Sequence, residues 1–206
     1  MQLRPYQRAA VNAVYLHLRR FDTNPVVVIP TAGGKTPTLA TICDDAVNLW
    51  QGRVLILAHV KELLQQAAEK LTAVCPNVDF GVFSAGLGKR QTEGDVIIAG
   101  IQSVHERADE LGHFDLVMID ECHLVPKEGD GMYRRFLADA KRVNPHLRVI
   151  GFTATPYRLD SGPICDESGP LHEIAYEIGV MDLIRDGYLC RPPAKAAKQK
   201  PDTSTL

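Results

Sequence analysis

Two short polar runs in this chain carry residue types that suit phosphate and magnesium chemistry, and the first of them spans residues 30–36. Gly33 and Gly34 let the backbone turn tightly, so that several amide N–H groups can converge on phosphate oxygens. Lys35 adds a positive charge for the outer phosphates, and Thr36 offers a hydroxyl to an accompanying Mg²⁺. This run therefore predicts a binding site for the phosphates of a nucleoside triphosphate.

The residues around this run predict a loop that ends at the start of a helix. Pro37 suits the first helical turn, where a missing N–H removes no hydrogen bond, and the positive helix end stabilises bound phosphate. The strict pattern G-x-x-x-x-G-K-S/T would place glycine at Ile29, and the common variant P-T-G-x-G-K-S/T would place it at Ala32. Gly33 comes directly after Ala32, which indicates that the flexible glycine position of the pattern is shifted by one residue in this chain. The run alone also fits a glycine-rich turn with a surface lysine.

The second polar run begins with Asp120 and Glu121, directly after the apolar residues 116–119. Adjacent side chains at a strand end diverge, so one carboxylate can hold Mg²⁺ while the other orients a water for attack on a γ-phosphate. Asp120 is the candidate metal ligand and Glu121 the candidate base. The pair alone also fits a polar turn, but together with the phosphate run it favours a catalytic site that includes Lys35.

The order of motifs resembles that of superfamily 2 helicases of the DEAD/DEAH-box type. Residues 120–123, Asp-Glu-Cys-His, resemble their motif II, and residues 30–36 resemble their motif I. Four more segments follow the same order: residues 3–7 resemble the glutamine motif, 59–63 motif Ia, 101–103 the T-x-Q-S segment, and 153–156 motif III. Six motifs in one order are more specific than any one of them.

The resemblance implies ATP and Mg²⁺ as cofactors. The implied ATP-binding residues are two in the glutamine motif, which reads adenine, and six in the phosphate loop: Arg4, Gln7, Thr31, Ala32, Gly33, Gly34, Lys35 and Thr36. The implied magnesium ligands are Thr36 and Asp120, and the implied catalytic residues are Lys35, Asp120 and Glu121.

The resemblance also implies nucleic acid, DNA in the first instance, as a partner. The implied contacts to its backbone come from His59, Lys61, Glu62, Gln102 and Ser103, although Ile101 stands where the family usually has threonine. His123, Thr153 and Thr155 would couple the ATP state to movement between two motor domains.

A finer resemblance is to RadD-type DNA repair ATPases of bacteria and their phage relatives, through residues 52–63, 144–148 and 151–159. It implies the ATP-driven motor domain of a DNA helicase or translocase, in DNA repair or phage DNA metabolism. Two alternatives stay open: a nucleotide-gated nucleic-acid-binding module without hydrolysis, and an RNA-directed helicase.

Strands and helices must alternate to position these residues. Apolar runs typical of buried strands occupy residues 26–29, 53–58, 80–84, 95–101, 116–120 and 147–152. Apolar residues at helical spacing follow Pro5 and recur over residues 61–74, and residues 181–185 predict a short helix. This alternation predicts an α/β fold with a mostly parallel sheet covered by helices on both faces. With the motifs, it implies a RecA-like P-loop NTPase domain whose chemistry lies at the carboxyl ends of the strands.

Composition sets the remaining bounds. A chain of 206 residues with 45% hydrophobic content can bury a sizeable core, and no apolar run approaches the roughly 18 residues of a membrane span. The net charge of −2 argues mildly against a free-standing nucleic-acid-binding domain, despite the basic pair Lys89 and Arg90. Five cysteines without C-x-x-C spacing indicate the reduced thiols of an intracellular protein. The resemblance to RadD-type ATPases and their phage relatives implies the cytoplasm of a bacterial or phage-infected cell.

Domain organisation follows from where the motifs stop. Residues 1–190 are expected to form the first RecA-like domain, and residues 191–206, rich in proline, alanine and lysine, a linker. The family's second RecA-like domain, which carries arginine fingers, is not expected within this chain. We therefore expect the chain alone to hydrolyse ATP slowly.

Overall fold

An eight-stranded β-sheet forms the centre of the computed structural model, which describes residues 2–58, 61–126, 131–158 and 162–191, with the backbone alone at 61–67. Its order is β10-β1-β7-β6-β2-β5-β3-β4, and within the described residues every neighbouring pair is parallel except β3 with β4. A second, antiparallel sheet joins β8 (Tyr157–Arg158) and β9 (Gly162–Pro163). The strands of the large sheet are β1 (Pro25–Val28), β2 (Val54–Ala58), β3 (Phe80–Ser84), β4 (Lys89–Arg90), β5 (Val96–Gly100), β6 (Leu116–Asp120), β7 (Arg148–Thr153) and β10 (Glu173–Glu177).

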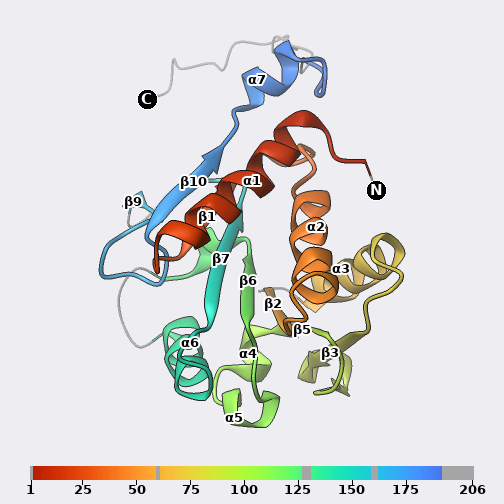
Figure 1. The fold of residues 1–206 in the computed structure, drawn as a ribbon, viewed down its shortest axis with the longest axis vertical. Coiled ribbons are helices and arrows are strands. Elements are labelled where there is room, and N and C mark those ends of the chain that lie inside the picture. Colours follow the sequence, from red (N-terminus) through yellow and green to blue (C-terminus); the bar gives the residue numbers. More distant parts are fainter. Residues whose placement is uncertain (1, 59–60, 127–130, 159–161, 192–206) are drawn as a thin grey trace, which may run out of the picture.

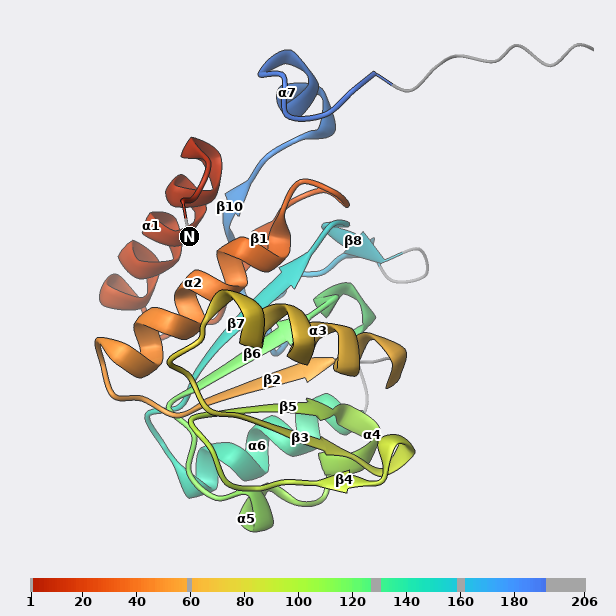
Figure 2. The same ribbon diagram turned by 90° about the vertical axis from the view of Figure 1, so that its right-hand side faces the viewer.

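Helices cover both faces of this sheet (Figures 1 and 2). On one face, buried side chains of α1, α2 and α3 pack against the strands; on the other, those of α4, α5 and α6 do so. The helices are α1 (Pro5–Arg20), α2 (Lys35–Asn48), α3 (Lys61–Val74), α4 (Ile101–Val104), α5 (Ala108–Leu111), α6 (Met132–Val143) and α7 (Val180–Arg185), with 3₁₀ turns at Ala85–Leu87 and Cys122–Leu124. No helix of the described residues is both long and apolar enough to cross a membrane.

Strand β2 shows why the sheet is buried on both sides. Successive side chains of a strand point to opposite faces, so Val54 and Ile56 join the core under α1 to α3, while Leu55 and Leu57 join the core under α4 to α6. All four are almost fully buried. Continuous apolar strands of this kind are typical of parallel sheets between two helical layers. The predicted α/β class is confirmed.

The carboxyl ends of β1, β7 and β6 meet at one edge of the sheet. In the parallel register Val28 pairs with Thr153, and Asp120 pairs with Phe152. The loop before α2 and the residues after β6 therefore lie on either side of the end of β7. This alignment brings together motifs that are far apart in the sequence.

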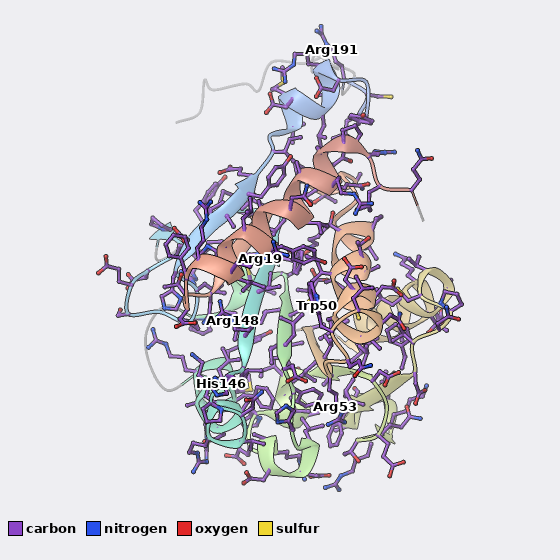
Figure 3. The ribbon with its side chains drawn as sticks, viewed as in Figure 1. Arg19, Trp50, Arg53, His146, Arg148 and Arg191 are labelled. Atoms are coloured by element: carbon purple, nitrogen blue, oxygen red, sulfur yellow. The ribbon has the colours of Figure 1, made fainter. Side chains whose placement is uncertain are left out.

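Two arginines hold the opposite, amino end of the sheet together. Arg53, just before β2, donates to the carbonyl oxygens of Gly94 at 3.0 Å and Leu111 at 2.8 Å. Arg148, the first residue of β7, donates to the carbonyl of Leu18 at 3.0 Å. Figure 3 shows both of them far from the end of the molecule where Arg191 lies. These guanidinium groups are structural hydrogen-bond donors.

Each of the predicted strands is present, with ends that agree within one residue. The helix over residues 61–74 and the helix that begins at Pro5 are also found. Helix α6 was not among the predicted helices, and β10 lies at the sheet edge next to β1, which no pattern in the sequence indicated. The expected linker, residues 191–206, lies outside the described residues except for Arg191.

Candidate active site

The loop between β1 and α2 is a tight turn, as predicted, but its left-handed positions are Ala32 and Gly34 and not Gly33, so the expected shift of the flexible position to Gly33 is wrong. Gly34 has a φ of 81° and Ala32 a φ of 63°, both in the left-handed region. Ala32 thus adopts the conformation usually given to glycine, at a cost of roughly 1–2 kcal/mol for a residue with a β-carbon. The N–H of Gly33 donates to the carbonyl of Pro30 at 2.8 Å, which closes the turn. The loop ends at the amino end of α2, as predicted.

Lys35 lies between the two carboxylates that follow β6. Its Nζ atom is 2.8 Å from Oδ1 of Asp120 and also donates to Oε1 of Glu121. Burial alone would lower the pKa of Lys35, but the attraction of Asp120 and hydrogen bonds to both carboxylates outweigh it, so this pKa is raised. The three predicted catalytic residues therefore form one charged cluster.

Both carboxylates thus face Lys35 instead of diverging as the sequence predicted, and this arrangement has a backbone cause. Glu121 has a φ of 51°, in the left-handed region, and its N–H donates to Oδ1 of Asp120 at 3.0 Å. This conformation turns the chain directly after β6. Oε1 of Glu121 then approaches Lys35, while its Oε2 lies 3.3 Å from Nδ1 of His123.

A cavity of about 330 Å³ joins the loop to these carboxylates. Ligand sites commonly have volumes of roughly 300–1,000 Å³. Its lining includes five of the predicted site residues together with residues of α2, β2 and α3: Thr31, Lys35, Thr36, Leu39, Ile56, Ala58, Lys70, Leu71, Asp120 and Glu121. Hydroxyl and carboxylate oxygens, the ligands that Mg²⁺ prefers, thus share one cavity with a lysine.

The glutamine motif is hydrogen-bonded to the same loop. Gln7 is only 4% exposed; its Oε1 accepts from the N–H of Arg4 at 2.8 Å, and its Nε2 donates to the carbonyl of Gly34 at 3.1 Å. A β-carbon on Gly34 would collide with this amide. The hydroxyl of Tyr6 donates to the carbonyl of Gly33 at 2.5 Å. The predicted base-reading and phosphate-binding residues are therefore in direct contact.

The three predicted coupling residues form one hydrogen-bonded chain. Oγ1 of Thr153 donates to the carbonyl of Thr155 at 3.1 Å and accepts from its N–H at 3.0 Å. Nδ1 of His123 lies 2.9 Å from the same oxygen. The hydroxyl of Thr153 thus joins His123 to Thr155. The chain reaches Glu121 through His123.

Residues 1–158 match the protein family described as "Type III restriction enzyme, res subunit", ResIII. The chain belongs to this family. Over 99% of its length it is 28% identical to "Putative ATP-dependent helicase IRC3" of Saccharomyces cerevisiae, and over 78% it is 32% identical to "DNA 3'-5' translocase XPB2" of Sulfurisphaera tokodaii. It covers 30% and 32% of those two proteins, so it spans about a third of their length.

Solved structures agree with the ResIII assignment. The Hef helicase domain of Pyrococcus furiosus superposes with a TM-score of 0.60 at 26% identity, over 77% of this chain and 34% of that one. The UvsW helicase of bacteriophage T4 superposes with a TM-score of 0.65 at 18% identity, over 85% of this chain and 60% of that one. The chain therefore has the fold of the first RecA-like domain of superfamily 2 helicases, as the motifs implied.

The predicted nucleic-acid contacts of this ResIII domain are only partly described. His59 lies outside the described residues, and Lys61 and Glu62 begin α3 with only their backbone described. Gln102 and Ser103, on α4, line a separate cleft of about 410 Å³ beside Lys89 and seven further residues: Phe83, Ala85, Gly88, Arg90, His105, Glu106 and Arg107. The structure thus does not test whether the two groups form one surface.

Two polar residues around this cleft already have internal partners. Oγ of Ser103 accepts from the N–H of Ala85 at 2.9 Å and so supports the turn after β3. Arg90 donates from Nε to Glu110 at 2.7 Å, and this contact with a carboxylate raises the pKa of Arg90. Ile101, which replaces the usual threonine, is fully buried. Its side chain serves the core of the ResIII domain.

Arg158, directly after motif III, has a structural role. It is 8% exposed and donates to the carbonyls of Val125 at 2.8 Å, Pro163 at 2.9 Å and Ile164 at 3.2 Å. Among the described residues, the lining of the cavity beside Lys35 contains lysines but no arginine. Arg158 therefore does not place its positive charge in that cavity.

Four residues near the site were missed by sequence reasoning. Tyr6 lies inside the glutamine motif and could have been included on that ground. Lys70 lies on the exposed end of α3, and no local pattern distinguishes it from other surface lysines. Leu183 and Tyr188 reach the loop and the glutamine motif only because β10 returns beside β1.

Proposed function

We propose that this domain binds ATP with Mg²⁺ and takes part in its hydrolysis, as the first RecA-like motor domain of a superfamily 2 helicase or translocase. The observation that carries the proposal is the convergence of Lys35, Asp120 and Glu121 beside a left-handed glycine loop. In open α/β sheets, ligands bind outside the carboxyl ends of the strands, which is where this cluster lies.

Each residue has a role that follows from its chemistry. Backbone N–H groups of residues 31–34, apart from that of Gly33, which is bonded to Pro30, bind the phosphates together with the Lys35 ammonium. Arg4 and Gln7 contact the base. Thr36 and Asp120 would hold Mg²⁺, which supplies charge neutralisation to the phosphates when bound. Glu121 orients the attacking water and accepts its proton. His123, Thr153 and Thr155 couple this event to domain movement.

A nucleic-acid partner, DNA in the first instance, is the second part of the proposal. Its support is the cleft beside Gln102, Ser103 and Lys89, and the printed name of the XPB2 relative, a DNA translocase. RNA is the alternative, because a further relative, 27% identical, is the "ATP-dependent RNA helicase DHX58" of Mus musculus. We also propose that the domain belongs to the RadD-type subgroup with a DEAH-box motif II. Its role would be in DNA repair or phage DNA metabolism, in the cytoplasm.

Hydrolysis is proposed to need a second RecA-like domain. Arginine fingers stabilise the charge that develops on the transferred phosphoryl group and are worth roughly 10³–10⁵ in rate. The described lining of the cavity contains no arginine. We expect residues 1–206 alone to bind ATP, to turn it over slowly and to respond little to DNA.

Titration and turnover measurements test the proposal with two variants. Lys35→Ala should weaken binding of MgATP at least tenfold, since the phosphates lose a cation. Glu121→Gln should keep that affinity and lower turnover by roughly 10²–10⁴ in the protein that carries both motor domains. Lys141→Ala, an exposed lysine on α6, is the control. Equal MgATP affinity of the wild type and Lys35→Ala would overturn the nucleotide assignment.

Turnover with DNA and with RNA separates the alternatives. Stimulation of the two-domain protein by single-stranded DNA, but not by RNA of the same sequence, supports the DNA motor. The reverse supports an RNA-directed helicase. Tight ATP binding without turnover on either nucleic acid supports a nucleotide-gated binding module.

A further inference from the structure

Helix α7 ends in a well-defined hydrogen-bonded cap. Gly187 has a φ of 76°, in the left-handed region, and its N–H donates to the carbonyl of Ile184 at 3.1 Å. The N–H of Tyr188 donates to the carbonyl of Leu183 at 2.7 Å. These two bonds form a Schellman motif, in which a left-handed glycine reverses the chain after the helix. The direction of Tyr188 is therefore fixed by the backbone.

This cap places Tyr188 on the glutamine motif. Its ring centroid lies 5.1 Å from that of Tyr6, edge to face, and the Arg4 guanidinium lies 5.1 Å from the Tyr188 centroid. Figure 1 shows α7 at the end of β10, above the start of α1. Leu183 is fully buried, and a β-carbon on Gly33 would stand 3.0 Å from its Cδ1. Helix α7 is thus packed on the phosphate loop.

Arg4 is an exposed side chain held at two points. The ring of Tyr188 lies under the guanidinium, and Nη1 of Arg4 donates to the hydroxyl of Tyr6 at 3.2 Å. A planar guanidinium fixed in this way presents a flat, cationic surface, and such surfaces stack on aromatic rings. An arginine without these contacts would lose rotamer freedom when it binds a ligand, and this loss would weaken the binding.

We propose that Tyr188 is a positioning residue for the purine base of the bound nucleotide. It orients Arg4 in advance, so that the guanidinium meets the base without further ordering, and it does not touch the phosphates. This inference rests on the proposed nucleotide binding at the same site. It adds a residue outside every motif that the resemblance identified.

Calorimetric titration of the chain with MgATP and with magnesium tripolyphosphate, which has no base, tests this role. Tyr188→Leu should weaken MgATP binding roughly two- to fivefold, the size of an exposed cation–π contact, and leave tripolyphosphate binding unchanged. Tyr188→Phe keeps the ring and should restore the wild-type affinity. In an Arg4→Met background, Tyr188→Leu should have no further effect, because Tyr188 acts through Arg4.

Phe21→Leu is the matched control, since Phe21 is an exposed aromatic residue just beyond the other end of α1. If Tyr188→Leu does not fold at the assay temperature, Tyr188→Met, whose unbranched and flexible side chain reaches further along the space of the ring, replaces it in every titration. Unchanged MgATP affinity, or an equal loss of affinity for both ligands, would overturn the positioning role. Failure of the wild type to bind either ligand would instead overturn the proposed function itself.

Discussion

Lys35 and Asp120 form an ion pair, with 2.8 Å between Nζ and Oδ1, although 85 positions separate them in the chain. Their side chains are 16% and 29% exposed, so water screens the pair only in part. The Lys35 ammonium is bound to Asp120, the carboxylate that we propose as a ligand of Mg²⁺. Binding of MgATP must therefore transfer Lys35 from Asp120 to the phosphates, and the metal takes its place.

This exchange predicts opposite effects of Asp120→Asn with and without Mg²⁺. MgATP affinity should fall roughly tenfold or more, because the metal loses a charged ligand. ATP affinity in the presence of a chelator should stay equal or rise, because Lys35 is released from one carboxylate. Titrations in both buffers measure the two effects, and Asp139→Asn on α6 is the control. The same loss in both buffers would contradict the exchange.

Thr153→Val should abolish the stimulation of ATP turnover by nucleic acid. Valine has nearly the same shape but neither accepts from His123 nor bonds to Thr155. In the two-domain protein we expect unstimulated turnover to be kept and stimulation by nucleic acid to be lost. The unpaired groups should lower the stability by roughly 1–3 kcal/mol. Thr153→Ser keeps the hydroxyl and should behave as the wild type; full stimulation in Thr153→Val would refute the coupling role.

Gly151→Ala should destabilise the domain through one close contact. The added β-carbon would stand 2.8 Å from Sγ of Cys122 and 3.1 Å from Cδ2 of Leu171, all within the core. Overpacking of this kind typically costs roughly 1–3 kcal/mol. Cys122→Ala removes the sulfur, so the double variant should recover part of the melting temperature that Gly151→Ala loses. Strict additivity of the two changes would show that the contact with Cys122 is not the cause.

The pH dependence of stability should contain a contribution from His172. Burial, Lys141 and His17 lower the pKa of His172, against the opposing charge of Glu173. The N–H of Asn24 donates to Nδ1 at 2.9 Å and so bonds to the neutral ring. A lowered folded-state pKa means that the neutral form is favoured in the fold. The contribution of neutral His172 to the stability of the fold is therefore complete above its unfolded-state pKa of about 6.5. This contribution is lost as the pH falls through the folded-state pKa.

Thermal unfolding of the wild type and His172→Asn between pH 8 and pH 5 tests this. Asparagine keeps a hydrogen-bond acceptor near the position of Nδ1 but does not titrate. As the pH falls, the melting temperature of the variant should therefore decrease less than that of the wild type. A hydrogen bond is worth roughly 0.5–1.5 kcal/mol, and each kcal/mol shifts the melting temperature by roughly 2–4 °C in a domain of this size. Parallel curves would exclude His172 as the titrating group.

The parts of the site that sequence could predict are those that local structure determines. Gly33 and Lys35 lie in and after the loop that follows the buried strand β1, and Asp120 ends the buried strand β6. The carboxyl ends of parallel strands meet at one edge, so the proximity of these residues follows from the fold class. The contact between His123 and Thr153 was expected from the family's motifs. The strands themselves were predictable because they are apolar throughout.

The parts that could not be predicted depend on strand order and on internal partners. Tyr188 meets Arg4 only because β10 pairs with β1 at the sheet edge, and no periodicity encodes that pairing. Ser103 and Arg158 have polar side chains beside functional motifs, yet their hydrogen bonds go to nearby backbone groups. Sequence gives the residue type, whereas the partner is decided by tertiary structure.

The place of β10 has a practical consequence for dissecting this protein. The match to the family ends at residue 158, whereas β10 spans Glu173–Glu177 and covers the outer side of β1 along Pro25 to Val28. A fragment cut at the family boundary would expose that strand as an unprotected edge, open to pairing with the same edge of another molecule. Such a fragment should aggregate on purification, so an expressed fragment should extend at least through Glu177, the end of β10.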